Sequence, residues 1–222
     1  INDINEESFI VIWTTTPWTL PSNKSVAIKK DLNYVLVTEG NENYVVAENL
    51  LEKFKERTEL NLKKLSQCSG EKLINLEAQH PFLNNKIKVI DSDHVTDDSG
   101  TGCVHIAPAH GVEDFELGKK YNLEVVNPIQ SNGVFSGFPE ELNGIHIYKL
   151  DEHIINILIR EKRLLSEKKF KHSYPHCWRT KTPLIYRATP QWFVSMHKNN
   201  LIEKTLKKLP DVNWIPSWGC LL

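Results

Sequence analysis

Hydroxyl-bearing side chains are concentrated near the beginning of the chain. Residues 13–23 read WTTTPWTLPSN, so four threonines, a serine and an asparagine lie among two tryptophans and two prolines. The threonines Thr14, Thr15 and Thr16 directly follow the apolar run 9–13, whereas a regular strand keeps its polar residues to one face. This crowding suits a small polar pocket with an aromatic wall. Threonine is also a good strand former, so an edge strand that ends in a proline turn is the alternative.

A second dense group of polar residues lies at residues 99–114, SGTGCVHIAPAHGVED. Gly100 and Gly102 permit a tight turn and a close approach of the backbone. If residues 103–107 form a strand, alternation places the imidazole of His105 on the face opposite its two apolar neighbours. The sequence therefore offers His105 to a cavity or to the surface.

Two carboxylates follow His105 in the first turn of a predicted helix. Negative charge is favoured at a helix N-terminus, so capping alone would explain Glu113 and Asp114. Asp114 also lies nine residues after His105, a spacing that fits a strand, a turn and one helical turn. This geometry can aim both side chains into one cleft. A carboxylate there suits an ammonium group, the imidazole can donate a hydrogen bond or limit the pocket's size, and no metal is required.

The elements that must position these groups are short strands and helices separated by turn signals. We expect strands at residues 9–13, 34–37, 44–47, 86–90, 103–107, 124–129 and 184–188. We expect helices at residues 48–57, 112–121, 151–165 and 200–209, of which the third has the clearest apolar stripe. This mixture indicates an α+β domain on a strongly curved sheet or barrel with helices at its edges.

Composition and charge narrow the class of protein. Hydrophobic residues make up 40% of the 222 residues and charged residues 25%, which is typical of an ordinary globular protein. A net charge of −1 excludes a generally basic nucleic-acid binder, and no apolar run approaches the length of a membrane span. The four cysteines form no CxxC pair, which fits a reducing compartment. Because an initiator Met and a signal peptide are lacking, we expect an excised part of a longer chain.

Three stretches of the chain together carry a family resemblance. Residues 13–23, residues 100–114, and the segments HCWRTKTP (176–183) and RATPQWF (187–193) resemble the editing insertion of isoleucyl-tRNA synthetases of the bacterial type, in the same order. Valyl and leucyl enzymes have a similar domain, but their threonine run usually continues with Arg-Pro. Here the run continues as Thr16-Pro17-Trp18, which favours the isoleucyl type.

The resemblance implies a β-barrel-rich α+β editing domain over residues 1–189 and a connector over residues 190–222 that leads back toward an absent catalytic domain. It implies hydrolysis of valine from valyl-tRNA(Ile), or of valyl-adenylate, while isoleucine is excluded. HIGH-like and KMSKS-like motifs are absent from the sequence, so no cofactor is expected in this part, although the parent enzyme uses ATP with Mg. The implied partners are the tRNA(Ile) acceptor end carrying valine and the remainder of the synthetase, in the cytoplasm and without a membrane.

The same resemblance assigns roles to individual residues. Asp114 corresponds to the carboxylate that holds the substrate's α-ammonium group, and His105 to the histidine that lines the amino-acid pocket and excludes isoleucine. The run Thr14–Thr16 corresponds to the hydroxyl wall around the ester and the water. Trp18 and Asn23 correspond to residues that position the side chain and the terminal adenosine. The family is generally thought to lack a dedicated protein base, and positioning and the tRNA's own ribose hydroxyl do much of the work, so no general base is assigned.

Two other enzyme or metal sites compete with this interpretation. Cys103 and His105 would share a strand face, but a third orienting group and a Gly-x-Ser-x-Gly elbow are missing from the sequence, which disfavours a cysteine or serine hydrolase. His172, His176 and Cys177 have spacings that fit a metal site, yet a fourth ligand has no obvious source.

A module that binds a tRNA end without chemistry is the remaining alternative. The basic segments 168–171 and 179–187 would contact phosphates, and neighbouring aromatic residues would stack on bases. An intact threonine run together with His105 and Asp114 favours a hydrolytic site instead.

Overall fold

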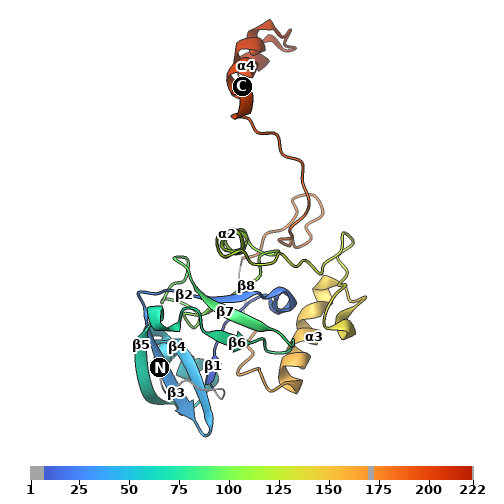
Figure 1. The fold of residues 1–222 in the computed structure, drawn as a ribbon. Helices are drawn as coiled ribbons and strands as arrows, with labels where there is room; N and C mark the ends of the chain where they lie inside the picture. Colours follow the sequence, from blue (N-terminus) through green and yellow to red (C-terminus); the bar gives the residue numbers. More distant parts are fainter. Residues whose placement is uncertain (1–7, 170–172, 222) are drawn as a thin grey trace. The chain divides into compact units, whose positions relative to one another are not determined.

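The computed structural model describes residues 8–169 and 173–221, and the chain divides into two units, Ile1–Ala188 and Thr189–Leu222 (Figure 1). The first unit contains every described strand. One sheet has the order β1-β4-β3-β5 and the other has the order β6-β7-β2-β8. The strands are β1 (Ser8–Ile10), β2 (Ser25–Ile28), β3 (Asn33–Glu39), β4 (Glu42–Ala47), β5 (Lys63–Ser69), β6 (Glu77–Gln79), β7 (Lys86–Asp91) and β8 (Val104–Ile106).

The described helices are divided between the two units. In the first unit they are η1 (Pro17–Ser22), η2 (Glu48–Leu50), α1 (Leu51–Thr58), η3 (Gly70–Leu73), α2 (Val112–Tyr121), η4 (Glu140–Leu142) and α3 (Ile147–Arg160). The second unit contains η5 (Lys198–Asn200), α4 (Leu201–Lys208), η6 (Leu209–Asp211) and η7 (Ser217–Leu221). The α+β class is confirmed. Within the described residues the strands form two open sheets and no closed barrel.

Strand β3 shows how the sequence builds the core. Its side chains alternate between two apolar clusters, as a period of two requires. Tyr34 and Leu36 pack with β2 and β7, whereas Val35 and Val37 pack with β4 and with Phe54 of α1. Because both faces of β3 are covered, the strand reads as a continuous apolar run.

A separate apolar cluster joins α3 to η1. Leu150, Ile154 and Ile157 of α3 are buried, and they pack with Trp18 and Leu20 of η1. The carboxylate of Asp151 accepts a hydrogen bond from the backbone amide of Trp18 at 3.0 Å. Helix α3 therefore fixes the segment that follows the threonine run.

Several of the expected elements are shorter than expected or are absent. The strands expected at 34–37, 44–47 and 86–90 are confirmed, whereas the first expected strand ends at Ile10 and the one at 103–107 covers only β8. Segments 124–129 and 184–188 are not strands, because their backbones bond to turns and to isolated bridges rather than to a ladder. The sequence gives no clear signal for β2, β5 and β6, which are short or lysine-rich.

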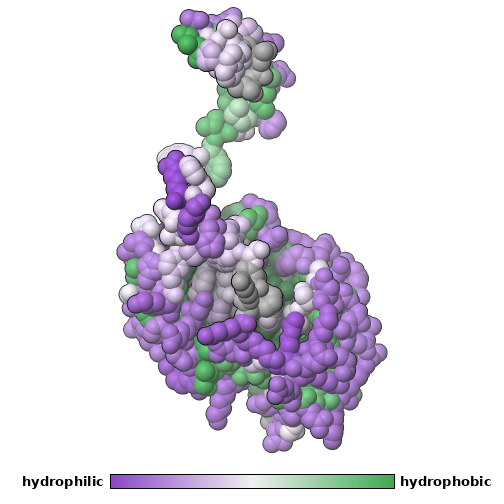
Figure 2. Space-filling view, turned by 180° about the vertical axis from the view of Figure 1, so that it is seen from behind, coloured by the Kyte–Doolittle hydropathy of each residue, from purple (hydrophilic) through white to green (hydrophobic). Residues whose placement is uncertain are grey.

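Figure 2 shows a largely hydrophilic surface over the face of the first unit that it presents. Among the described residues, no helix combines the length and apolarity that crossing a membrane requires.

Two buried histidines hold η1 in place. The Nδ1 atom of His80 accepts amide hydrogens from Phe82 and Leu83, so its Nε2 carries the proton and donates to the carbonyl of Leu20 at 2.9 Å. The Nε2 atom of His105 lies 3.2 Å from the hydroxyl of Thr19. Burial lowers the pKa of each imidazole to about 4, so both are neutral at pH 7.

We expect acid to weaken the fold through these two histidines. Below the unfolded pKa of about 6.5 the unfolded chain takes up protons that the folded sites refuse, so stability present above that pH is lost as the pH falls toward 4. Each histidine lowers the free energy of unfolding by up to about 1.4 kcal/mol per pH unit. Burial raises the pKa values of Asp114 and Asp151, which acts in the opposite direction.

Urea unfolding at several pH values measures this slope. His80→Gln should flatten it, because the amide cannot titrate, and His153→Gln on the exposed face of α3 serves as the control. An unchanged slope in His80→Gln would show that this imidazole does not control acid stability.

Candidate functional site

A pocket of about 340 Å³ brings both polar clusters of the sequence together. It is lined by residues 13–15, by His94 and Thr96 from the loop after β7, by residues 99–105, and by Asp114. The volume falls in the range of small-molecule sites, roughly 300 to 1,000 Å³. These lining segments are far apart in sequence, so the fold itself assembles the pocket.

The threonine run is a bend between β1 and η1 rather than a strand. The hydroxyl oxygen of Thr14 accepts a hydrogen bond from the backbone amide of Thr16 at 3.1 Å, a local contact that competes with sheet pairing. Thr15 is exposed at the pocket, and Thr14 is half-buried in its lining. Thr16 lies outside the lining, and its carbonyl accepts the hydroxyl of Thr19 at 2.9 Å.

Strand β8 places His105 in the pocket wall. The strand pairs with β2, with His105 opposite Val26, and the side chain is only 8% exposed. The hydroxyl of Thr19 already donates to Thr16, so the Nε2–H of His105 is the donor in their contact. Its Nδ1 is then an acceptor, and it finds no partner among the described residues. A buried acceptor without a partner costs about 1–3 kcal/mol, and such exceptions call for a functional explanation.

Asp114 bends back over the turn that precedes its helix. Its Oδ2 accepts the amide hydrogen of Ala107 at 2.8 Å, and the N-cap of α2, Gly111, makes no side-chain cap. A Cβ atom on Gly111 would lie 3.2 Å from the Asp114 carboxyl carbon, so glycine gives this carboxylate room. Burial raises the pKa of Asp114, and the hydrogen bond from Ala107 opposes that effect. Capping of its own helix therefore does not explain this residue.

The two remaining predicted site residues lie elsewhere. Trp18 is buried against α3, with its ring 4.8 Å from the ring of His110. Asn23 is buried and its side-chain oxygen accepts the amide of Ser25 at 3.3 Å. Because η1 turns the chain into the core, neither lines the pocket. The aromatic wall belongs to Trp13, which is 43% exposed and has the guanidinium of Arg57 5.7 Å from its ring centre.

Sequence reasoning missed the contribution of the loop after β7. His94 and Thr96 line the pocket, and the ring of His94 is oriented by a 2.6 Å contact between its Nδ1 and the hydroxyl of Ser92. The only available signal is the polar run DSDHVTDDS at residues 91–99. Such a run is also typical of any surface loop.

Cys103 also lines the pocket, but its thiol is a poor nucleophile. The side chain is 2% exposed, and burial raises its pKa to about 12. The thiolate is the reactive form of cysteine. This observation counts against a cysteine hydrolase.

The alternative metal site has no support in the structure. His172 lies outside the described residues. In the part of the chain that the structure describes, no three His, Cys, Asp or Glu side chains come together as a metal site.

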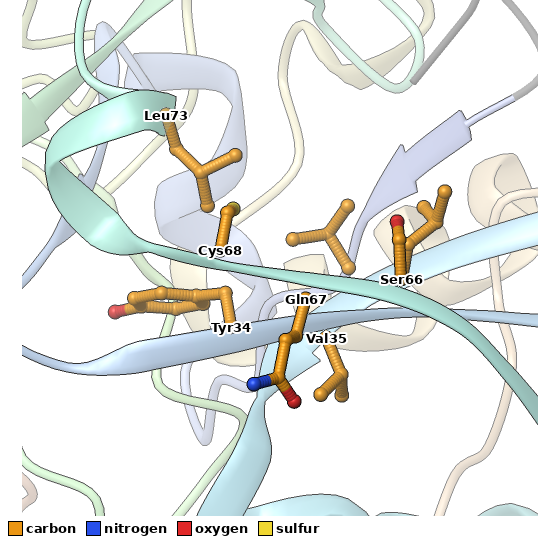
Figure 3. A pocket seen from close by; sticks show the side chains of 8 residues that line it. Tyr34, Val35, Ser66, Gln67, Cys68 and Leu73 are labelled. Atoms are coloured by element: carbon orange, nitrogen blue, oxygen red, sulfur yellow. The ribbon is translucent and has the colours of Figure 1, made fainter. Parts of the chain in front are cut away.

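A second hollow lies beside β3 and β5. Figure 3 shows Tyr34, Gln67 and Cys68 around it, and its volume is about 10 Å³. A space of this size holds at most about one water molecule. The pocket at His105 and Asp114 is therefore the candidate site.

Comparison with known proteins gives a consistent result. Residues 2–143 match the family model described as "Leucyl-tRNA synthetase, editing domain". The isoleucine–tRNA ligase of Teredinibacter turnerae is 50% identical over 211 residues, which are 95% of this chain and 23% of that protein. The isoleucine–tRNA ligase of Francisella philomiragia is 46% identical over 220 residues, which are 99% of this chain and 24% of that protein. The chain thus spans about a quarter of the length of these relatives.

Solved structures show the same fold at low identity. The crystal structure titled GlLeuRS-CP1 has a TM-score of 0.59 and 15% identity, covering 73% of this chain and 85% of that chain. The editing domain of the P. knowlesi cytosolic leucyl-tRNA synthetase has a TM-score of 0.57 and 12% identity, covering 72% of this chain and 84% of that chain. The family match includes the threonine run, His105 and Asp114. This chain therefore belongs to the family of aminoacyl-tRNA synthetase editing domains.

Proposed function

We propose that this chain hydrolyses valine esterified to isoleucine tRNA, and also accepts valyl-adenylate, while it spares isoleucine. The observation that carries the proposal is the shared lining of one pocket by Thr14, Thr15, His105 and Asp114. Such an activity compensates for the limited selectivity of amino-acid binding. An apolar pocket discriminates only weakly against a substrate that lacks one methylene, and isoleucine against valine is the standard example. A second site that admits only the smaller side chain removes the error.

The carboxylate of Asp114 is suited to the substrate's α-ammonium group. One of its oxygens is occupied by the amide of Ala107, and the other is left for a ligand. Burial disfavours the ionised carboxyl, and a bound ammonium would compensate that charge. Charge complementarity therefore favours substrates with a free amino group.

Selection of the amino-acid side chain is assigned to the wall formed by His105. The imidazole is neutral at pH 7, so it does not repel the ammonium group, and Thr19 fixes its orientation. The pocket as a whole is much larger than one methylene. Exclusion of isoleucine therefore depends on the local shape beside His105 rather than on total volume.

The reaction is the attack of water on the ester carbonyl. A bond forms from the water oxygen to the carbonyl carbon, the bond to the ribose oxygen breaks, and valine and tRNA with a free terminal hydroxyl are released. The hydroxyls of Thr14 and Thr15 position the ester and the water, and the neighbouring ribose hydroxyl assists. This chemistry needs neither a protein nucleophile nor a metal, and the use of ATP with Mg belongs to the synthetic reaction of the parent enzyme.

The partners that we propose are the acceptor end of tRNA(Ile) carrying valine and the remainder of a synthetase chain in the cytoplasm. Trp13 at the pocket supplies an exposed ring on which the terminal base can stack. A module that binds the acceptor end without hydrolysis is the second candidate. The polar ester-sized pocket and the half-buried carboxylate favour the hydrolytic one.

Paired deacylation separates the two candidates. The chain should release valine from valyl-tRNA(Ile) and leave isoleucyl-tRNA(Ile) largely intact, because only valine fits beside His105. Release of the labelled amino acid from each ester measures both rates. Equal cleavage of the two esters would contradict size selection, and binding without cleavage would favour the binding module.

Replacement of Asp114 by asparagine tests ammonium recognition. Asp114→Asn should lower the hydrolysis rate about 10- to 100-fold, the scale of one hydrogen bond to a charged group. In the unchanged chain the hydrolysis rate should fall as the pH drops through the raised pKa of Asp114. In Asp114→Asn this decrease of the rate at low pH should be absent. Glu116→Gln, an exposed carboxylate further along α2, is the matched control. An identical pH profile in Asp114→Asn would remove this residue from the site.

Replacement of His105 by alanine tests selectivity. His105→Ala removes the wall, so isoleucyl-tRNA(Ile) should be cleaved about tenfold faster once steric overlap of about 1–3 kcal/mol is relieved. The ratio of the two deacylation rates measures the effect, with His153→Ala on exposed α3 as the control. Retained preference for valine in His105→Ala would assign selection to another residue.

A further inference from the structure

His110 connects three segments that are far apart in the sequence. Its Nε2 lies 3.0 Å from the hydroxyl of Ser22 at the end of η1, and its Nδ1 lies 3.1 Å from the carbonyl oxygen of Tyr186. The side chain is 9% exposed, and the ring of Trp18 packs against it edge-on. The imidazole is therefore a buried junction and not a surface group.

The partners of His110 determine its protonation. A carbonyl oxygen can only accept, so Nδ1 carries the hydrogen that is donated to Tyr186. Nε2 then accepts the hydroxyl hydrogen of Ser22. Burial lowers the pKa of His110, which keeps this neutral tautomer in place at pH 7.

The turn that carries His110 also carries the hydrogen bond to Asp114. The amide of His110 donates to the carbonyl of Ala107 at 2.9 Å, and the amide of Ala107 donates to Asp114 at 2.8 Å. The backbone of Gly111 accepts the amide of Phe115 at 3.0 Å, which joins the turn to the start of α2. A displacement of His110 is therefore transmitted to the Asp114 carboxylate.

A second set of contacts anchors residues 184–188, which we call the return segment. The amide of Ala188 donates to the carbonyl of Ala109 at 2.7 Å, and the side chain of Asn127 donates to the carbonyl of Ala188 at 2.8 Å. The bond from His110 to Tyr186 lies beside these contacts. The turn at residues 107–110 thus contacts η1 through Ser22 and the return segment through Tyr186 and Ala188.

We propose that His110 is a positioning residue for hydrolysis: its bond to Ser22 sets the spacing between η1 and the turn that leads to Asp114. The inference depends on the proposed hydrolytic function. Helix η1 directly follows Thr16 and holds His105 through Thr19. The contact between His110 and Ser22 therefore positions both the threonine wall and the His105 wall of the pocket. The bond to Tyr186 has the separate role of holding the return segment.

Two amide side chains distinguish the two bonds. His110→Gln places an amide nitrogen near the position of Nε2, where it donates to the hydroxyl oxygen of Ser22, so the contact is kept with its direction reversed. His110→Asn places one near the position of Nδ1 and keeps the contact with Tyr186. His110→Ala removes both, Ser22→Ala removes only the first, and His153→Gln on exposed α3 is the control.

We expect the deacylation kcat of valyl-tRNA(Ile) to fall about 10- to 100-fold in His110→Ala, His110→Asn and Ser22→Ala, because a misplaced reacting group loses that much. His110→Gln should remain within a few-fold of the unchanged chain. Ser22→Ala combined with His110→Asn should be no slower than either alone, since both remove the same contact. If His110 were purely structural, the loss of kcat in each variant would follow its loss of stability. It would not depend on which ring-nitrogen position the amide side chain retains.

Amide hydrogen exchange gives a readout that does not need activity. Exchange at Ala107 should accelerate about tenfold in His110→Asn and not in His110→Gln, whereas exchange at Ala188 should show the reverse pattern. Equal kcat values and equal Ala107 exchange in the two amide variants would overturn the positioning role. If the unchanged chain cleaves neither ester, the proposed function fails, and the exchange pattern still decides what His110 holds.

Discussion

The structure depends on how the short helix η1 is held from outside. Pro17 and Pro21 have no amide hydrogen, and a six-residue 3₁₀ turn has poor internal hydrogen bonds, so η1 cannot hold its own shape. Side chains from four other segments therefore contact it: Asp151, His80, His105 and His110. The threonine run directly precedes η1. The four side chains that hold η1 therefore also determine where the threonines lie in the pocket.

Burial of the anchors also gives the pocket its electrostatic character. Removal from water penalises the charged forms of the imidazoles of His80, His105 and His110. In the described part of the chain no carboxylate is hydrogen-bonded to them, so this penalty is not compensated. Asp114 is then the carboxylic acid of the lining; burial raises its pKa, the hydrogen bond from Ala107 and the charge of His94 lower it, and Glu113 raises it further. A cationic group entering the pocket is the partner that this arrangement favours. The stability of the fold and the charge of the pocket thus depend on the same removal of side chains from water.

The sequence predicted the components of the site better than their arrangement. Thr14, Thr15, His105 and Asp114 lie in one pocket, because the spacing from strand to helix start is local and glycine leaves room for the carboxylate. Trp18 and Asn23 lie in the core, where Trp18 packs against the apolar face of α3. Strands β3 and β4 were predicted from their apolar runs at residues 34–37 and 44–47. Strand β5, with its lysines, and the His94 loop depend on long-range pairing that no local pattern reveals.

The turns carry more of the site than the strands do, and this has a physical consequence. Among the groups at the pocket, His105 lies on a strand, Thr14 lies on a bend where its hydroxyl accepts the amide of Thr16, and Asp114 lies in the first turn of α2, where its carboxylate accepts the amide of Ala107. A ladder would fix Thr14 and the turn before α2 rigidly, whereas isolated bonds leave them dependent on distant partners such as α3 and residues 184–188. Small shifts in those partners change the separation of hydroxyl and carboxylate groups. A pocket built in this way requires the surrounding fold to be complete before its polar groups converge.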